Sequence, residues 1–113
     1  MAVNFTNSRE RIKSAIDKIA YESAVEQIAN IETQRAVELR DSGKVKEAEA
    51  TLNSNASYLD SAARLISSPK LSRQSLESKA EAEAVAEDEQ WNESRKAIKA
   101  KTYKRSKQQE RGK

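Results

Sequence analysis

The stretch from Gly43 to Pro69, GKVKEAEATLNSNASYLDSAARLISSP, decides how this chain folds. Large apolar residues recur in it every seven positions, at Val45, Leu52, Leu59 and Ile66. Seven residues make about two turns of an α-helix, so these side chains share one face. Alanines lie beside them, at Ala48, Ala56, Ala62 and Ala63. The stretch therefore predicts an amphipathic helix from Lys44 to Ser67.

The two ends of this stretch predict where the neighbouring helices end and begin. Gly43 suits the left-handed position that closes a helix, and the segment before it has no glycine or proline back to Ser8. Asn7 or Ser8 is a candidate N-cap for that first long helix. Ser68 can cap a third helix with Pro69 at its first position. The short turn at Gly43 predicts an antiparallel helical hairpin, with the third helix packed along it.

We therefore predict an all-α fold of three long helices. The apolar periodicity nominates one set of core residues: Ile12, Ile16, Ile19, Ile28, Ile31, Leu39, Val45, Leu52, Leu59, Ile66, Leu71 and Trp91. Ahead of the helices, Val3–Thr6 alternates apolar and polar residues, as the remnant of a strand would. The expected organisation is a strand remnant or linker over residues 1–7, a helical bundle over 8–102 and a basic flexible tail over 103–113.

Charge is distributed unevenly along the chain. Residues 1–94 carry 12 Lys and Arg against 17 Asp and Glu, a net charge of −5, whereas residues 95–113 carry nine bases and one acid, a net charge of +8. A basic segment of this kind can contact nucleic acid or an anionic surface. The alternative is a solvated helix end, whose bases favour the negative end of the helix dipole and pair with acids on neighbouring helices.

The candidate contact residues lie in the last quarter of the chain. The candidate polyanion contacts are Arg95, Lys96, Lys99, Lys101, Lys104, Arg105 and Lys107. Trp91 and Tyr103 are candidate contacts for a protein partner, because aromatic residues are enriched at the centres of interfaces. A lone tryptophan at helical spacing from Ala84 and Ile98 also has a second interpretation, as a core residue.

Composition argues against catalysis. The chain has no cysteine or histidine, so disulfides, histidine-assisted nucleophiles and ordinary zinc sites are excluded. The acids between Glu77 and Glu93 lack the central glycine of a calcium loop and the histidine of a di-iron bundle, and are interpreted as a solvated helix face. We predict no catalytic, cofactor-binding or metal-binding residues. No apolar run reaches the length of a membrane span, and the compartment is left open.

Several segments resemble the C-terminal helical region of bacterial von Willebrand factor type A domain proteins of the Ca-activated chloride channel homologue type. They are Val3–Glu10, Ala24–Ala29, Ala36–Lys44, Asn55–Leu59, Ser68–Leu71, and Trp91-Asn92 with Arg95, Lys96 and Tyr103. In that family the helices follow the last strand of preceding domains, which would explain a strand at Val3–Thr6. The metal-binding Asp-x-Ser-x-Ser pattern of the A domain is missing here, so no site residue is carried over.

The leading hypothesis is a non-catalytic interaction or scaffold module, contacting a protein partner or its own upstream domains. Two alternatives remain open: binding of nucleic acid or an anionic surface through the basic end, and homo-oligomerisation through apolar stripes that pair between chains.

Overall fold

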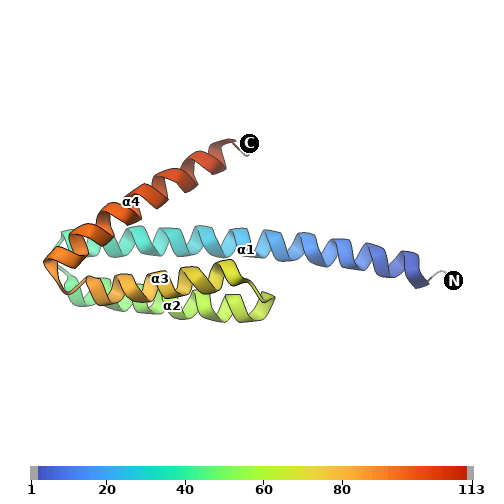
Figure 1. Cartoon of the computed structure of the whole chain (residues 1–113), viewed down its shortest axis with the longest axis horizontal. Coiled ribbons are helices and arrows are strands. Elements are labelled where there is room, and N and C mark those ends of the chain that lie inside the picture. The colour runs from blue at the N-terminus through green and yellow to red at the C-terminus, as the bar shows by residue number, and fades with distance from the viewer. Residues whose placement is uncertain (1–2, 112–113) are drawn as a thin grey trace.

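The computed structural model describes the backbone of residues 3–111 and the side chains of residues 11–104. Its elements are helices only: α1 (Val3–Asp41), α2 (Val45–Ile66), α3 (Pro69–Ala84) and α4 (Asp88–Arg111) (Figure 1). No strand occurs within residues 3–111. The prediction of an all-α chain is confirmed.

Both predicted turns are where the sequence places them. Gly43 has a φ of 83°, and the amide of Lys44 donates to the carbonyl of Leu39 at 2.8 Å, which closes the end of α1. At the second turn, the Ser68 hydroxyl accepts a hydrogen bond from the amide of Leu71 at 3.2 Å. Pro69 follows it at the start of α3, where a missing amide hydrogen costs nothing.

The number of helices and the strand remnant were predicted wrongly. Residues from Val3 onward belong to α1, since neither glycine nor proline separates them from the helix that follows. The third helix is two helices, because the chain turns at residues 85–87. Arg40 holds this turn by donating from Nε to the carbonyl of Val85 at 2.9 Å and by an ion pair with Asp88. The basic segment expected as a flexible tail has a helical backbone to Arg111.

Helices α2 and α3 form a tight antiparallel hairpin, and the C-terminal half of α1 lies along it (Figure 1). Small residues let the backbones approach. The hydroxyl of Ser75 donates to the carbonyl of Ala56 at 2.8 Å, and that of Ser78 donates to the carbonyl of Leu52 at 2.9 Å. Such contacts satisfy buried hydroxyls and fix the register of the hairpin.

Among the described side chains, the core consists of two apolar clusters. One, near the Gly43 turn, contains Ala36, Val37, Ala48, Leu52, Ala82, Val85, Trp91 and Ile98. The other, near the Ser68 turn, contains Val25, Ala29, Leu59, Ala62, Ala63 and Leu71. A polar layer around Asn55 lies between them.

The predicted core is right for α2, Leu71 and Trp91 but wrong for most of α1. Leu52, Leu59, Leu71 and Trp91 are buried, and Leu39, Val45 and Ile66 are half-buried. The isoleucines of α1 are exposed: Ile12, Ile16, Ile19, Ile28 and Ile31. The physical reason is that α1 presents alanine and valine to the hairpin, since closely approaching helices leave no room for larger residues.

The molecule is elongated, at 64 × 29 × 17 Å. Its radius of gyration is 17.3 Å, against about 13 Å for a compact domain of this length. The cause is α1, whose first half extends past the α2–α3 turn (Figure 1). That turn meets α1 at Glu22, which accepts a hydrogen bond from the Ser68 hydroxyl. Residues 11–20 are all exposed.

Candidate interaction surfaces

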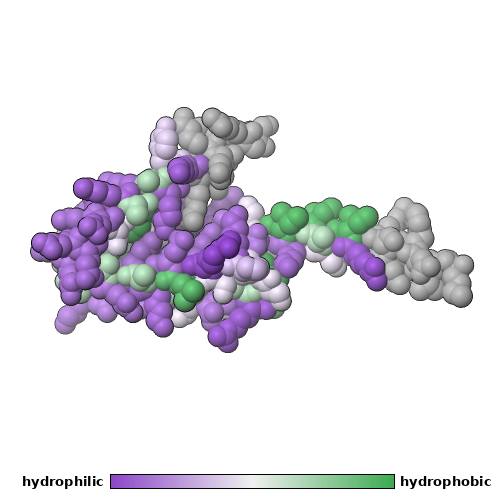
Figure 2. Space-filling view, in the orientation of Figure 1, coloured by the Kyte–Doolittle hydropathy of each residue, from purple (hydrophilic) through white to green (hydrophobic). Residues whose placement is uncertain are grey.

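The projecting half of α1 carries an apolar stripe. Ile12, Ile16 and Ile19 are 62%, 60% and 67% exposed, and their spacing of four and three residues aligns them on one face. We call these three residues the isoleucine stripe. Figure 2 shows an apolar patch on the projecting arm. Large contiguous apolar surface on a soluble protein marks an interaction site.

The isoleucine stripe points to the side of α1 on which α4 packs. Eighteen residues make about five helical turns, so Ile12 lies in line with Asn30 and Ile19 with Val37. Asn30 accepts a hydrogen bond from Thr102 of α4, and Val37 packs in the core cluster that includes Ile98. An open cleft of about 480 Å³ separates α1 from α4 here, with Val37, Ile98 and Tyr103 among its walls.

Helix α4 is held to the bundle by ion pairs and by two buried apolar side chains. Arg95 donates from Nε and Nη2 to the two carboxylate oxygens of Asp41, at 3.1 and 2.8 Å. This hydrogen bonding holds the pKa of Asp41 below its usual value, and nearby Lys99 and Arg40 add to the effect. The apolar anchors of α4 are Trp91, 3% exposed, and Ile98.

Lys101 makes the other attachment of α4. Its ammonium lies 2.9 Å from Glu77 and 3.1 Å from Glu81, both on α3. Burial alone would lower the pKa of Lys101, but the two carboxylates outweigh burial and raise the pKa. Lys101 therefore links α4 to α3 as a cation at neutral pH.

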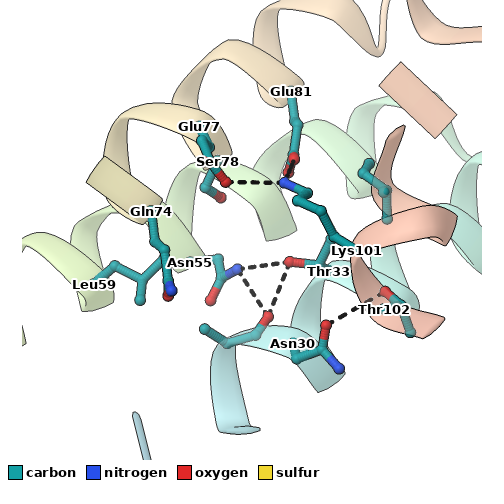
Figure 3. A pocket seen from close by; sticks show the side chains of 12 residues that line it. Asn30, Thr33, Asn55, Leu59, Gln74, Glu77, Ser78, Glu81, Lys101 and Thr102 are labelled. Carbon is teal, nitrogen blue, oxygen red and sulfur yellow. Dashed lines mark hydrogen bonds and ion pairs between the residues drawn. The ribbon is translucent and has the colours of Figure 1, made fainter. Parts of the chain in front are cut away.

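Beneath Lys101 is a small polar cavity of about 20 Å³, with the side chains of Asn55, Thr33, Asn30, Ser78 and Thr102 around it (Figure 3). The amide of Asn55 donates to the carbonyl of Ala29 at 3.0 Å and to the hydroxyl of Thr33 at 3.1 Å. The Asn55 carbonyl oxygen is buried with no hydrogen-bond partner among the described atoms. This volume holds about one water molecule, so the cavity is a structural feature and not a substrate site.

The predicted contact residues lie in different environments. Trp91 is a core residue, in agreement with its second interpretation, whereas Tyr103 is 65% exposed beside the cleft. Arg95 and Lys101 are occupied by ion pairs, so they contribute less to a polyanion surface than predicted. Lys96, Lys99 and Lys104 are exposed. The side chains of Arg105 and Lys107 lie outside the described residues.

Sequence reasoning missed the isoleucine stripe as a surface, because it assigned these residues to the core. The signal was the run of small residues at Val25, Ala29 and Ala36, a second apolar face of α1 on a different side from the isoleucine stripe.

Within the described side chains, no group of three or more acids lies close enough to share a metal ion. Over the same part of the chain, no helix combines the length and apolarity needed to cross a membrane. Comparisons with protein-family models, with curated proteins and with solved structures give no match. The surfaces themselves are therefore the basis for the functional argument.

Proposed function

We propose that this chain is a non-catalytic helical interaction module. The observation that carries the proposal is the isoleucine stripe, which extends beyond the bundle and meets no other helix in the described part of the chain. Helix α1 would act as an arm: its second half belongs to the bundle, and its first half binds a protein surface. Three isoleucines on one helical face suit the helix-to-helix mode of recognition, in which residues at i, i+4 and i+7 contact one partner.

Site-specific photo-crosslinking in the cells that make the protein tests this function. A benzophenone amino acid at position 16 should give a covalent adduct with a protein chain. The same group at position 76 of α3 is the control, since Leu76 is 68% exposed but lies off the stripe. Absence of a specific adduct at positions 12, 16 and 19 would contradict the proposal.

A second candidate function is binding of a polyanion by α4. The exposed ammonium groups of Lys96, Lys99 and Lys104 on one helix support it. Titration of a fluorescent single-stranded DNA should show affinity that falls with salt, with a logarithmic slope of about −2 for three phosphate contacts. Lys96→Gln with Lys104→Gln should flatten that slope, and the exposed α2 variant Lys46→Gln should not. A salt-independent or absent signal would rule this function out.

The origin of the chain is a further part of the proposal. We propose that the chain is the C-terminal region of a von Willebrand factor type A domain protein. The sequence resemblance alone supports this proposal. The resemblance would have explained a strand at Val3–Thr6, but these residues are helical, so this part of the resemblance no longer supports the proposal. An A domain encoded in frame ahead of residue 1 would support the parent, and a stop codon directly ahead of residue 1 would contradict it.

A further inference from the structure

The cleft between α1 and α4 combines an aromatic ring, a cation and apolar walls. Its volume is about 480 Å³, within the range of about 300–1,000 Å³ that small-ligand pockets occupy. The buried side chains of Val37 and Ile98 form part of its walls, and Lys99 and Tyr103 of α4 line it with them. Helix α4 leans away from α1 toward its C-terminal end, and the cleft is open to solvent (Figure 1).

We propose that this cleft binds an unpaired base of a single-stranded nucleic acid, which stacks on the ring of Tyr103. The inference rests on the polyanion-binding function proposed for α4 and names its ligand. The ammonium of Lys99 would contact a phosphate beside the bound base. The carboxylate of Glu38, on the α1 side of the cleft, would accept a hydrogen bond from an amino group on the edge of that base.

The position of Tyr103 among the lysines of α4 is the first argument for this ligand. Lys99 and Lys96 precede Tyr103 by four and seven residues, which places the three side chains on one side of the helix. Both lysines are exposed, and the Tyr103 side chain is 65% exposed. Proteins bind single strands through aromatic rings set among bases, since every nucleobase has a face that can stack.

The distribution of charge on α4 is the second argument. Residues 95–104 contain five bases and no acid. Arg95 and Lys101 pair with acids of α1 and α3. The other three are exposed, at Lys96, Lys99 and Lys104. Because a single strand carries a phosphate at each nucleotide, a base in the cleft brings phosphates close to these ammonium groups.

The cleft itself distinguishes a single strand from other polyanions. The bases of a duplex are paired and stacked on one another, so they cannot stack on Tyr103, whereas the bases of a single strand can be splayed out. A flat anionic surface would contact the exposed lysines without entering the cleft. An unpaired base therefore makes use of both the lysines and the cleft between α1 and α4.

The acids on the α1 side of the cleft indicate which bases fit. The carboxylate of Asp41 accepts hydrogen bonds from Arg95, whereas Glu38 is exposed on the same side. An ionised carboxylate only accepts hydrogen bonds, so it pairs with an amino group such as that of cytosine. Thymine has no amino group. We therefore expect cytosine to bind more tightly than thymine.

Fluorescence anisotropy of the full chain with a labelled cytosine strand of about ten nucleotides tests the stacking. Tyr103→Leu should weaken binding about tenfold, and Tyr103→Phe, which keeps the ring, should stay within about twofold of the parent. Lys99→Gln should reduce the salt slope by about 0.7, whereas Tyr103→Leu should leave the slope unchanged. Circular dichroism should show that each variant is folded. A Tyr103→Leu chain that binds as tightly as the parent would overturn the stacking.

A thymine strand of the same length tests the role of Glu38, since it carries the same number of phosphates. It should bind about fivefold more weakly than the cytosine strand, and Glu38→Ala should remove most of that difference. Equal binding of the two strands by the parent would overturn the role of Glu38.

A duplex of the same length separates failure of this inference from failure of the polyanion function. Weaker binding of the duplex than of the cytosine strand supports both. Duplex binding as tight as that of the single strand would overturn the inference and leave the polyanion function in place. Absence of salt-dependent binding to every one of these probes would overturn both.

Discussion

The two halves of α1 belong to one uninterrupted helix, but one half buries small apolar residues and the other exposes large ones. The half from Glu22 to Asp41 lies on the α2–α3 hairpin through Val25, Ala29, Ala36 and Val37, all small or medium in size. The half before Glu22 has the isoleucine stripe, and no helix in the described part of the chain covers it. Along α1, small residues make the internal contact and the large isoleucines lie on the exposed surface. Size alone is therefore a poor guide to the core of an alanine-rich bundle.

The largest expected difference in the free energy of unfolding is between substitution of a core residue and substitution of the isoleucine stripe. Leu52 is fully buried, so Leu52→Ala should lower the free energy of unfolding by about 3 kcal/mol through lost burial and a cavity. Ile16→Ala should change it by less than about 0.5 kcal/mol when measured at a concentration that keeps the chain monomeric. Urea unfolding followed by circular dichroism measures both. Equal losses would mean that the stripe is part of the stabilising core.

Enlarging an alanine side chain compares the packing of the two halves of α1 directly. Ala36 is 0% exposed between helices, so Ala36→Leu should destabilise the bundle by about 2 kcal/mol, because the added atoms have no space. Ala20 is the matched residue in the projecting half, and Ala20→Leu should change the stability of the monomer by less than about 0.5 kcal/mol. A tolerated Ala36→Leu would show that the close approach of α1 to the hairpin is not required.

These residues also show what the sequence could and could not predict. Gly43 and the Ser68–Pro69 pair set two turns through local backbone chemistry, and both were predicted. The seven-residue repeat identified the buried face of α2, since Leu52 and Leu59 are buried against α1 and α3. The α3–α4 break was missed because no glycine or proline marks it. The sequence carries a weaker signal for this break at Asp88 and Glu89, because acidic residues favour the first turn of a helix.

The surface of α1 could not be predicted because α1 has two apolar faces. Periodicity indicated that Ile12, Ile16 and Ile19 share a face, but it contains no information on which face of α1 the hairpin covers. That choice depends on how closely the helices approach, which the serines and alanines of α2 and α3 determine. The ion pairs of α4 could not be predicted from the sequence either, since Arg95 and Asp41 are 54 residues apart along the chain.

A smaller effect concerns the attachment of α4 to the rest of the bundle. Lys101→Met removes the ion pairs with Glu77 and Glu81, and should destabilise the protein by about 1 kcal/mol after solvent screening. Lys79→Met, on the exposed side of α3, is the control and should be neutral. Because the pKa of Lys101 is raised in the folded protein, its contribution should be complete below about pH 10.5 and lost above it. A pH-independent difference between Lys101→Met and the parent from pH 8 to pH 12 would contradict this.

The smallest effect is the acid response of the Arg95–Asp41 contact. The pKa of Asp41 is lowered in the folded protein, so the stability from this contact is present above the ordinary value of 3.8 and is lost as pH falls through the folded value. Trp91, the only tryptophan, lies near the start of α4 and reports its docking by fluorescence. Acidification should shift its emission to the red below about pH 4. Asp41→Asn should reduce the pH dependence of that emission, and an unchanged acid response would contradict the assignment.

Hydrogen exchange of the dilute full chain tests the central claim about α1 most directly. The amides of residues 25–37 should be strongly protected, because the α2–α3 hairpin covers this half of the helix. The amides of residues 12–19 should exchange rapidly, because in the described part of the chain no other helix covers them. Protection of residues 12–19 as strong as that of residues 25–37 would contradict the account.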